Sequence, residues 1–176
     1  MCNAVLVVDM LKGFLEDGHN LYCGDHARRV IPKIRKLLED EIALGSKVFY
    51  ICDNHEPDDL EFDMFPVHCL VGSEESEIIP ELLDLPGERI NKQRYSGFYN
   101  SSLQKQLESL GPDKVIVCGV CTDICVMHTV ADARNRDYNV EIHVDTVSTF
   151  DMDAHKWALR HMEKVLGARL IGQHSG

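Results

Sequence analysis

The stretch that decides the fold runs from Lys114 to Val126 and has the sequence KVIVCGVCTDICV. Its first part, 114–119, is almost continuously apolar and β-branched, which is typical of a parallel strand buried on both faces. A turn over 119–122 then leads into a helix predicted over 122–136. A buried strand that passes directly into a helix favours an open parallel sheet covered by helices.

The same alternation of strand and helix recurs along the rest of the chain. Further strands are predicted over 4–9, 47–53, 89–91, 140–145 and 169–171, and further helices over 26–44, 100–110 and 151–166. This alternation predicts a single α/β domain over residues 1–176 with a three-layer α/β/α architecture. Its middle layer is expected to be a mostly parallel, Rossmann-like, six-stranded sheet. Residues 54–85 break the pattern, and their prolines, acidic residues and histidines predict a functional loop region followed by a short helix.

The composition narrows the classes of function. The chain has 176 residues, of which 44% are hydrophobic, and a formal net charge of −11. Because that charge repels phosphate backbones and anionic membranes, we expect neither nucleic acid nor a membrane as a partner. Seven cysteines in a chain of this length, with no basic leader before Asn3, lead us to expect a reduced, cytoplasmic protein.

Chemically active residues fall at the predicted strand ends. In open parallel sheets, ligands bind beyond the carboxyl ends of the strands, where the strand order reverses. The residues predicted there are Asp9, Asp53 with His55, Lys92 and the segment 119–125. A carboxylate, two potential metal ligands, a lysine and a thiol are therefore expected along one edge of the sheet.

Cys125 lies in the first turn of a predicted helix. The helix dipole and the unpaired backbone N–H groups there favour a thiolate, the nucleophilic form of cysteine, and could also bind an oxyanion. One alternative is that Cys125 is simply a small, buried hydrophobic residue with no chemical role. A second is a redox or regulatory module in which Cys118, Cys121 and Cys125 bind zinc or an iron–sulfur cluster, although Cys118, inside the strand, is expected to face a helix layer.

Asp53 and His55 lie two residues apart on an extended segment, so their side chains point the same way. Glu61 and His68 belong to the irregular interval that could fold back toward them. Two imidazoles with one or two carboxylates suit zinc, manganese or iron. The alternative is an acidic, solvated loop in which the histidines are scattered without a shared role.

Asp9 and Lys92 each end an apolar strand, where an ionised group is costly unless it has a partner. A structural ion pair between them would meet that need. A functional interpretation uses the same pair, with Lys92 holding Asp9 near the thiol and Asp9 accepting the thiol proton. Aromatic residues that follow the polar strand ends could wall a small planar pocket, namely Phe14, Phe65, Tyr95 and Phe98.

Together these segments resemble the isochorismatase-like cysteine hydrolases and, within them, the nicotinamidase/pyrazinamidase branch. The matches occur in the family's order and extend from Asp9 to about Ala133. They are Val7-Val8-Asp9-Met10, Asp53-x-His55, residues 65–72 (FPVHCLVG), Lys92 with residues 95–98 (YSGF), and residues 119–126 (GVCTDICV).

The resemblance implies a role for each matched residue. Cys125 matches the nucleophile, Asp9 the general base and Lys92 the third member of a catalytic triad. The backbone N–H groups of Cys121 and Cys125 match the oxyanion hole, in a turn that the family usually builds with a cis peptide before the residue at Cys121. The family's ring-binding walls correspond to Phe14, Phe65 and Tyr95.

The resemblance also implies one divalent metal ion, with zinc expected first and manganese or iron as alternatives. Asp53, His55 and His68 match the ligands, and Glu61 matches a fourth ligand that only some members have. In the family, the metal binds a pyridine nitrogen and orients the carboxamide toward the thiol. Family habit further leads us to expect a homodimer or a larger homo-oligomer.

The implied activity is hydrolysis of nicotinamide, or a pyrazinamide-like carboxamide, to the acid and ammonia through a cysteine thioester, a reaction of NAD salvage. The partner is then a small carboxamide. Several positions depart from the family pattern: Leu11-Lys12-Gly13 replaces a frequent Gln-Asn-Asp, Phe65 and Asn54 each replace a frequent tryptophan, and Gly97 replaces an alanine. A related hydrolase that acts on a ureido or other non-aromatic amide therefore remains an alternative.

Overall fold

A parallel sheet lies at the centre of the structure, a computed structural model that describes residues 2–172. Its order is β3-β2-β1-β4-β5-β7, with β6 paired to the end of β4, and the six strand pairs between described residues are all parallel. The strands are β1 (Ala4–Val8), β2 (Lys47–Asp53), β3 (Glu88–Lys92), β4 (Val115–Val120), β5 (Val140–His143), β6 (Val147–Ser148) and β7 (Arg169–Ile171). Residues 1 and 173–176, the ends of the predicted domain, lie outside the described range.

Within residues 2–172 the sheet has seven strands, so the prediction of six was wrong by one. The additional strand, β6, has only two residues, which is too short to give a periodic pattern. It follows a 3₁₀ turn at Val144–Thr146, where the predicted strand over 140–145 ends early. The mostly parallel α/β/α class itself is confirmed.

The helices are α1 (Lys12–Leu15), α2 (Asp25–Arg28), α3 (Ile31–Ala43), α4 (Leu103–Leu110), α5 (Met127–Arg134) and α6 (Met152–Lys164). The predicted helix over 26–44 is split in two, and Pro32 stands in the first turn of α3, where its missing N–H is not needed. In place of the short helix predicted within 54–85, the chain forms 3₁₀ turns at Leu60–Asp63, Glu74–Ser76 and Pro80–Leu82. Within residues 2–172, no helix combines the length and apolarity needed to cross a membrane.

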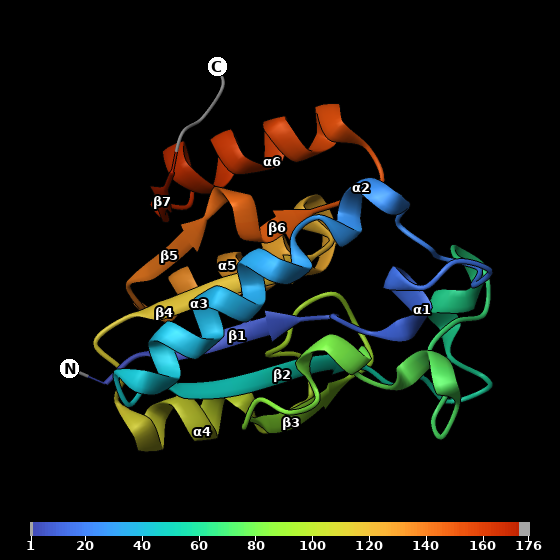
Figure 1. The fold of residues 1–176 in the computed structure, drawn as a ribbon, viewed down its shortest axis with the longest axis horizontal. Coiled ribbons are helices and arrows are strands. Elements are labelled where there is room, and N and C mark those ends of the chain that lie inside the picture. Colours follow the sequence, from blue (N-terminus) through green and yellow to red (C-terminus); the bar gives the residue numbers. More distant parts are fainter. Residues whose placement is uncertain (1, 173–176) are drawn as a thin grey trace.

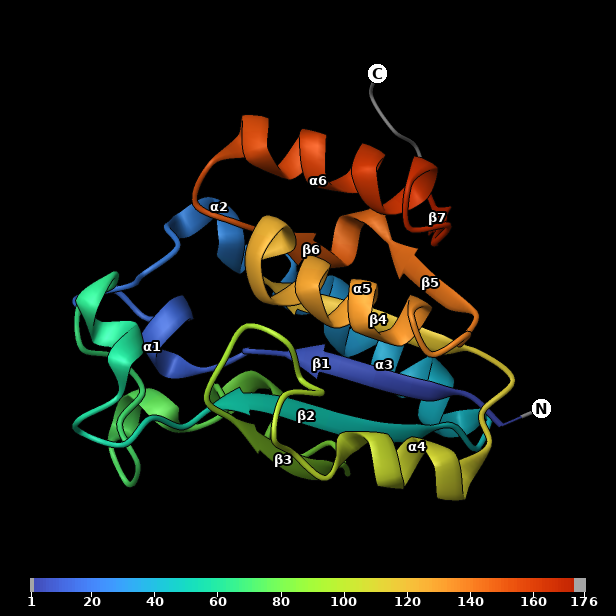
Figure 2. The ribbon, with the colours of Figure 1, turned by 180° about the vertical axis from the view of Figure 1, so that it is seen from behind.

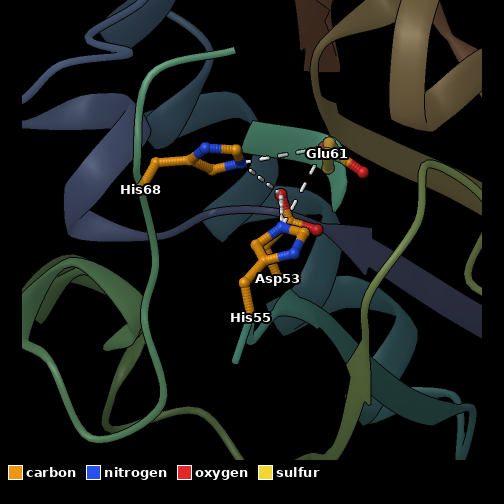
Figure 3. A group of neighbouring side chains, drawn as sticks. All are labelled: Asp53, His55, Glu61 and His68. Atoms are coloured by element: carbon orange, nitrogen blue, oxygen red, sulfur yellow. Dashed lines mark ion pairs between the residues drawn. The ribbon is translucent and has the colours of Figure 1, made fainter. Parts of the chain in front are cut away.

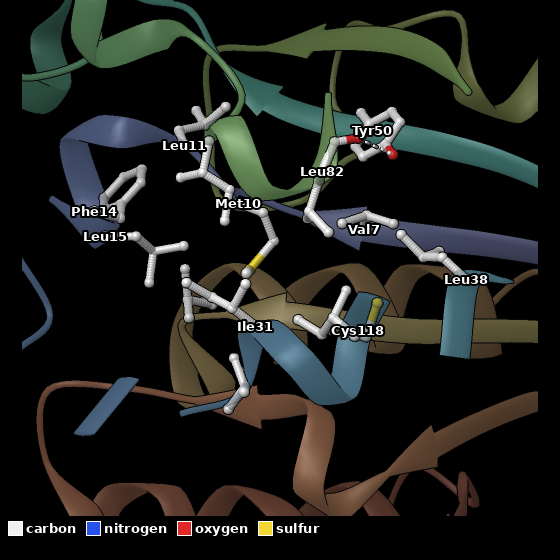
Figure 4. Packing of buried hydrophobic residues seen from close by; sticks show 14 of the residues in the cluster. Val7, Met10, Leu11, Phe14, Leu15, Ile31, Leu38, Tyr50, Leu82 and Cys118 are labelled. Atoms are coloured by element: carbon white, nitrogen blue, oxygen red, sulfur yellow. Dashed lines mark hydrogen bonds between the residues drawn. The ribbon is translucent and has the colours of Figure 1, made fainter. Parts of the chain in front are cut away.

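The helices cover the sheet on both faces. Figure 1 shows α3 in front of β1 and β4, and Figure 2, from behind, shows α4, α5 and α6 on the opposite face. Side chains alternate accordingly: Val5 and Val7 pack toward α3, whereas Leu6 and Val8 pack toward α4 and α5. Figure 4 shows the α3 side, where Val7 and Cys118 lie among buried side chains that come from several elements. The apolar strands are therefore buried on both faces, as their composition predicts.

The strand order reverses between β1 and β4. The chain passes from β1 to β2 and β3 on one side, and β4 then pairs with the other side of β1. Asp9 directly follows β1, and residues 121–125 directly follow β4. The fold thus brings these two segments together at the place where open parallel sheets bind ligands.

Candidate active site

Three polar side chains from three strand ends meet in the buried floor of the site. Lys92, the last residue of β3, places its Nζ 2.9 Å from Asp9 Oδ2 and 3.5 Å from Cys125 Sγ. Lys92 also donates a hydrogen bond to Asp53, its register partner on β2, and the backbone N–H of Asp53 donates to Asp9 Oδ1 at 2.9 Å. The structure therefore brings the predicted triad together, and Asp53 links it to the predicted metal ligands.

Burial sets the protonation of this cluster. Burial, followed by the charge of Asp53, raises the pKa of Asp9 to about 6, while Lys92 opposes that rise. Burial also raises the pKa of the Cys125 thiol well above its usual range, although Lys92 lowers it. Burial lowers the pKa of Lys92, but the charges of Asp53 and Asp9 outweigh it and keep the lysine protonated. A neutral thiol thus lies beside a carboxylate whose proton affinity suits a general base near neutral pH.

The turn that carries Cys125 differs in detail from the prediction. Residues Thr122–Val126 form a π-helical turn, and α5 begins only at Met127. The peptide between Val120 and Cys121 is cis, as the resemblance implies. Cys121 and Cys125 both line the same pocket.

The four predicted metal ligands gather in one group, which Figure 3 shows. Asp53 Oδ2 lies 3.6 Å from the Nε2 atoms of both His55 and His68, and Glu61 Oε1 lies 3.8 Å from His68 Nε2 and 4.0 Å from His55 Nε2. One donor atom from each of the four lies within 4.8 Å of every other. Asp53 ends β2, His55 follows it, and Glu61 stands in the first 3₁₀ turn of the long loop.

This group fits a divalent cation. Both imidazoles engage their outer nitrogen elsewhere: His55 Nδ1 contacts Asp59 Oδ2 at 2.9 Å, and His68 Nδ1 donates to the backbone carbonyl of Pro66 at 2.8 Å. Their Nε2 atoms therefore face the carboxylates, and His55 Nε2 and Glu61 Oε2 are buried without a hydrogen-bond partner. Nitrogen and carboxylate donors turned inward, with second-sphere hydrogen bonds behind them, are typical of a site for zinc or a related ion.

A pocket of about 340 Å³, including open solvent at its mouth, joins the thiol to the metal-ligand group. The three predicted aromatic residues all line it. The ring centroids of Phe65 and Tyr95 lie 6.3 Å apart, nearly perpendicular, and Phe14 lies 5.8 Å from the His68 ring. Leu21, Ile124 and Phe150 complete the apolar wall. Phe98 lies elsewhere, in the core beside α4.

Comparisons with known proteins agree with this geometry. The isochorismatase domain family matches residues 3–173. The chain belongs to the isochorismatase family. It is similar to a crystal structure of a nicotinamidase from Bacillus subtilis, with 30% identity, a TM-score of 0.91, and coverage of 98% of this chain and 100% of the other.

Two further solved relatives of this isochorismatase-family hydrolase bear on its chemistry. An N-carbamoylsarcosine amidase from Thermoplasma acidophilum is 32% identical, with a TM-score of 0.88 and coverage of 100% of both chains. A pyrazinamidase from Pyrococcus horikoshii, whose structure is in complex with zinc, is 27% identical, with a TM-score of 0.88 and coverage of 97% and 99%. The family thus joins hydrolases of more than one kind of amide.

The isochorismatase-family fold argues against the cysteine-cluster alternative. Cys118 points into the core under α3 and donates to the carbonyl of Leu6, while Cys125 belongs to the buried cluster on the other face. The Sγ atom of Cys121 instead lies 3.5 Å from that of Cys23. Among the described residues, no metal-ligand group contains Cys118 or Cys121.

Several residues of the site escaped the sequence analysis. Phe62 packs on both imidazoles, with ring centroids 5.4 Å from His55 and 5.6 Å from His68. Leu21, Ile124 and Phe150 reach the pocket from three separate segments. An isolated apolar residue in a loop gives no periodic signal, so only the folded arrangement reveals these contacts.

Proposed function

We propose that this isochorismatase-family hydrolase cleaves nicotinamide, or a close neutral ring carboxamide, to the acid and ammonia. One observation carries the proposal: the pocket joins the Cys125 thiol to the metal-ligand group between aromatic walls, and within residues 2–172 no lysine or arginine lines it. A small planar neutral molecule suits such a pocket, because Asp9, Asp53 and Glu61 already line it and no described side chain apart from the metal-ligand group could balance a further negative charge.

The second candidate is a ureido hydrolase, which the 32% identity to an N-carbamoylsarcosine amidase favours. An N-carbamoylated amino acid carries a carboxylate, and the carboxylates of Asp9, Asp53 and Glu61 already line this pocket. The divalent ion would already be shared by Asp53 and Glu61, and within the described residues no lysine or arginine in the wall pairs with a further carboxylate. The wall therefore favours the neutral ring amide over the anionic ureido substrate.

The first half of the reaction forms a thioester. Asp9 takes the proton from Cys125 Sγ, and the thiolate attacks the carboxamide carbon. Lys92, between the two groups, stabilises the negative charge wherever it resides. The backbone N–H groups of Cys121 and Cys125 receive the oxyanion, and each such donor is typically worth roughly 3 kcal/mol of transition-state stabilisation. When the C–N bond breaks, Asp9 returns its proton to the leaving nitrogen, which departs as ammonia.

The second half of the reaction restores the enzyme. Asp9, again a carboxylate, takes a proton from water, and the resulting hydroxide attacks the thioester carbon. The C–S bond then breaks, the acid is released, and the proton held by Asp9 returns to the sulfur. The pKa of about 6 at Asp9 suits both proton transfers near neutral pH.

Asp53, His55, Glu61 and His68 would hold the divalent ion. When bound, that ion supplies a Lewis acid at which a ring nitrogen can be fixed. The aromatic walls of Phe65 and Tyr95 restrict the ring to one plane.

A substrate panel on the purified protein tests the proposal. Ammonia release is measured with nicotinamide, pyrazinamide, benzamide, N-carbamoylsarcosine and N-carbamoylglycine. We expect the highest kcat/KM for nicotinamide or pyrazinamide and a large loss for benzamide, which has the ring but no ring nitrogen. Faster hydrolysis of the two ureido acids would reject the proposal in favour of the second candidate.

A further inference from the structure

We propose that Asp59 is a positioning residue that orients two ligands of the metal site, His55 and Glu61, and that Arg94 holds Asp59 in place. This inference rests on the proposed metal-dependent function. It concerns a residue outside the ligand set and outside the pocket wall.

Each oxygen of the Asp59 carboxylate has a separate task. Oδ2 lies 2.9 Å from His55 Nδ1, and this contact turns the Nε2 atom of the same ring toward Asp53 and Glu61. Oδ1 accepts the backbone N–H of Glu61 at 2.9 Å, which starts the 3₁₀ turn that carries the Glu61 side chain. A single buried carboxylate thus fixes the ring of one ligand and the backbone of another.

Arg94 anchors this carboxylate from a different part of the chain. Its Nη1 lies 2.7 Å from Asp59 Oδ1, and its guanidinium lies over the ring of Tyr99 at 5.9 Å from the centroid. Arg94 stands two residues after Lys92 and directly before Tyr95. The contact therefore ties the metal-binding loop to the segment that carries the catalytic lysine and one aromatic wall.

The burial of these groups argues for more than a surface ion pair. The Asp59 side chain is 5% exposed and His55 is fully buried, so the contact between them is little screened by water. A carboxylate behind a ligating imidazole fixes the tautomer and raises the basicity of the nitrogen that faces the metal. Loss of such a partner typically weakens metal binding by about 10- to 100-fold.

Three substitutions separate this role from a purely structural one. In Asp59→Asn, the amide oxygen can still accept the Glu61 N–H, since asparagine is as good an N-cap as aspartate, but the negative charge facing His55 is lost. Asp59→Ala removes both contacts. Arg94→Gln leaves the carboxylate in place and removes only its anchor.

The measurement is zinc affinity, determined by competition with a chromophoric chelator, together with the visible absorption of the cobalt(II)-substituted protein. We expect Asp59→Asn to bind zinc about 10- to 100-fold more weakly than the wild type and to shift the cobalt bands. Asp59→Ala should lose at least as much affinity, and Arg94→Gln should lose less than either. Glu141→Gln is the matched control. Glu141 is a buried carboxylate on β5, and its Oε1 lies 2.9 Å from Lys114 Nζ. The Glu141→Gln variant should bind zinc like the wild type.

The outcomes separate this inference from the proposed function. Unchanged zinc affinity and cobalt spectra in folded Asp59→Asn and Asp59→Ala would overturn the positioning role, whatever the substrate. Circular dichroism that shows Asp59→Asn to be unfolded would also overturn it, since the residue would then be structural. Weakened zinc binding in a protein that does not hydrolyse nicotinamide would support Asp59 and reject only the proposed substrate.

Discussion

Lys92 and Asp9 form an ion pair with 2.9 Å between Nζ and Oδ2, and neither side chain is more than 1% exposed. Asp53 accepts a second contact from the same ammonium group, and Cys125 Sγ lies 3.5 Å from it. One buried cation therefore faces two carboxylates and the thiol. The Lys92 ammonium is already paired with Asp9 and Asp53, so it is not free to balance the charge of an anionic substrate.

Replacing this lysine should affect both stability and activity. In Lys92→Met, the two carboxylates lose their cation inside the protein, and breaking a buried ion pair in this way typically costs about 3–5 kcal/mol. We expect a loss of that size in the free energy of urea unfolding and no measurable ammonia release. Lys12→Met is a suitable control because Lys12 pairs with the exposed residues Glu74 and Glu77, and it should change stability by less than about 1 kcal/mol.

The close approach of β1 and β4 depends on Gly119. Its φ is +114°, and a Cβ there would lie 2.0 Å from the carbonyl oxygen of Val8, directly before Asp9. In Gly119→Ala the strained φ alone costs about 1–3 kcal/mol, and the two strands must also separate. We expect a lower melting temperature and a lower kcat, because Asp9 and Cys125 follow these strands.

Gly111→Ala separates the two effects of the Gly119 substitution. Gly111 has a φ of +58° at the end of α4, but a Cβ there meets no atom within 4 Å. This variant should show backbone strain with unchanged kcat. Equal losses of stability in the two variants would show that the contact with Val8 is unimportant.

The three cysteines of the 114–126 segment should respond differently to substitution. Cys125→Ala should abolish ammonia release, because it removes the nucleophile. Cys121→Ala keeps the backbone N–H of the proposed oxyanion hole, and Cys118→Ala changes only the core under α3, so both should retain most activity. Activity lost in the latter two variants but kept in Cys125→Ala would require a different nucleophile.

Strand ends could be predicted from the sequence because two signals coincide there. Runs such as 4–8 and 115–120 are apolar throughout, and Asp9 and Asp53 stand out as the polar residues at or directly after such runs, whereas Lys92 ends a strand in which only Ile90 is apolar. The rule that parallel strands end at one edge then places them together. Glu61, in contrast, lies in the irregular interval, where the sequence indicates only that it could fold back toward Asp53 and His55, and the family resemblance then matches it to a fourth ligand.

The features of the site and fold that could not be predicted from the sequence depend mainly on contacts between distant segments. Asp59 matters because the loop folds so that its two oxygens reach His55 and the N–H of Glu61, and residues 54–85 give no periodicity from which that path could be read. Phe150 enters the pocket from the segment before α6. Strand β6 was missed because two residues are too few for a pattern.

Metal removal should lower stability as well as activity. Without a cation, Asp53 and Glu61 crowd the two imidazoles, and a ligand bound only by the folded state adds about 2.7 kcal/mol of stability at 100 times its Kd. We expect dialysis against a chelator to lower the melting temperature and zinc to restore it.

Elemental analysis of Asp53→Ala should show the loss of about one divalent ion per chain. Iron with acid-labile sulfide, lost on Cys118→Ser, would instead support a cysteine cluster.

No lysine or arginine of the described residues lines the pocket, and this predicts how readily the product leaves. Nicotinamide is neutral, but the acid formed from it is an anion that shares the pocket with Asp9, Asp53 and Glu61. Apart from the divalent ion that Asp53 and Glu61 would share, no described cation in the wall holds this anion, so we expect nicotinic acid to inhibit only weakly. Phe150 is 40% exposed at the pocket, so Phe150→Lys can place an ammonium group there without burying it.

In Phe150→Lys, the added cation should attract the carboxylate of the product. A partly exposed ion pair is worth about 0.2–1 kcal/mol, which corresponds to an inhibition constant for nicotinic acid lowered by up to about fivefold. Steady-state ammonia release at several concentrations of added nicotinic acid measures this constant. Phe150→Gln serves as the neutral control, since it removes the same ring without adding charge. Equal inhibition of the two variants, or strong inhibition of the wild type, would show that charge in the wall does not govern product release.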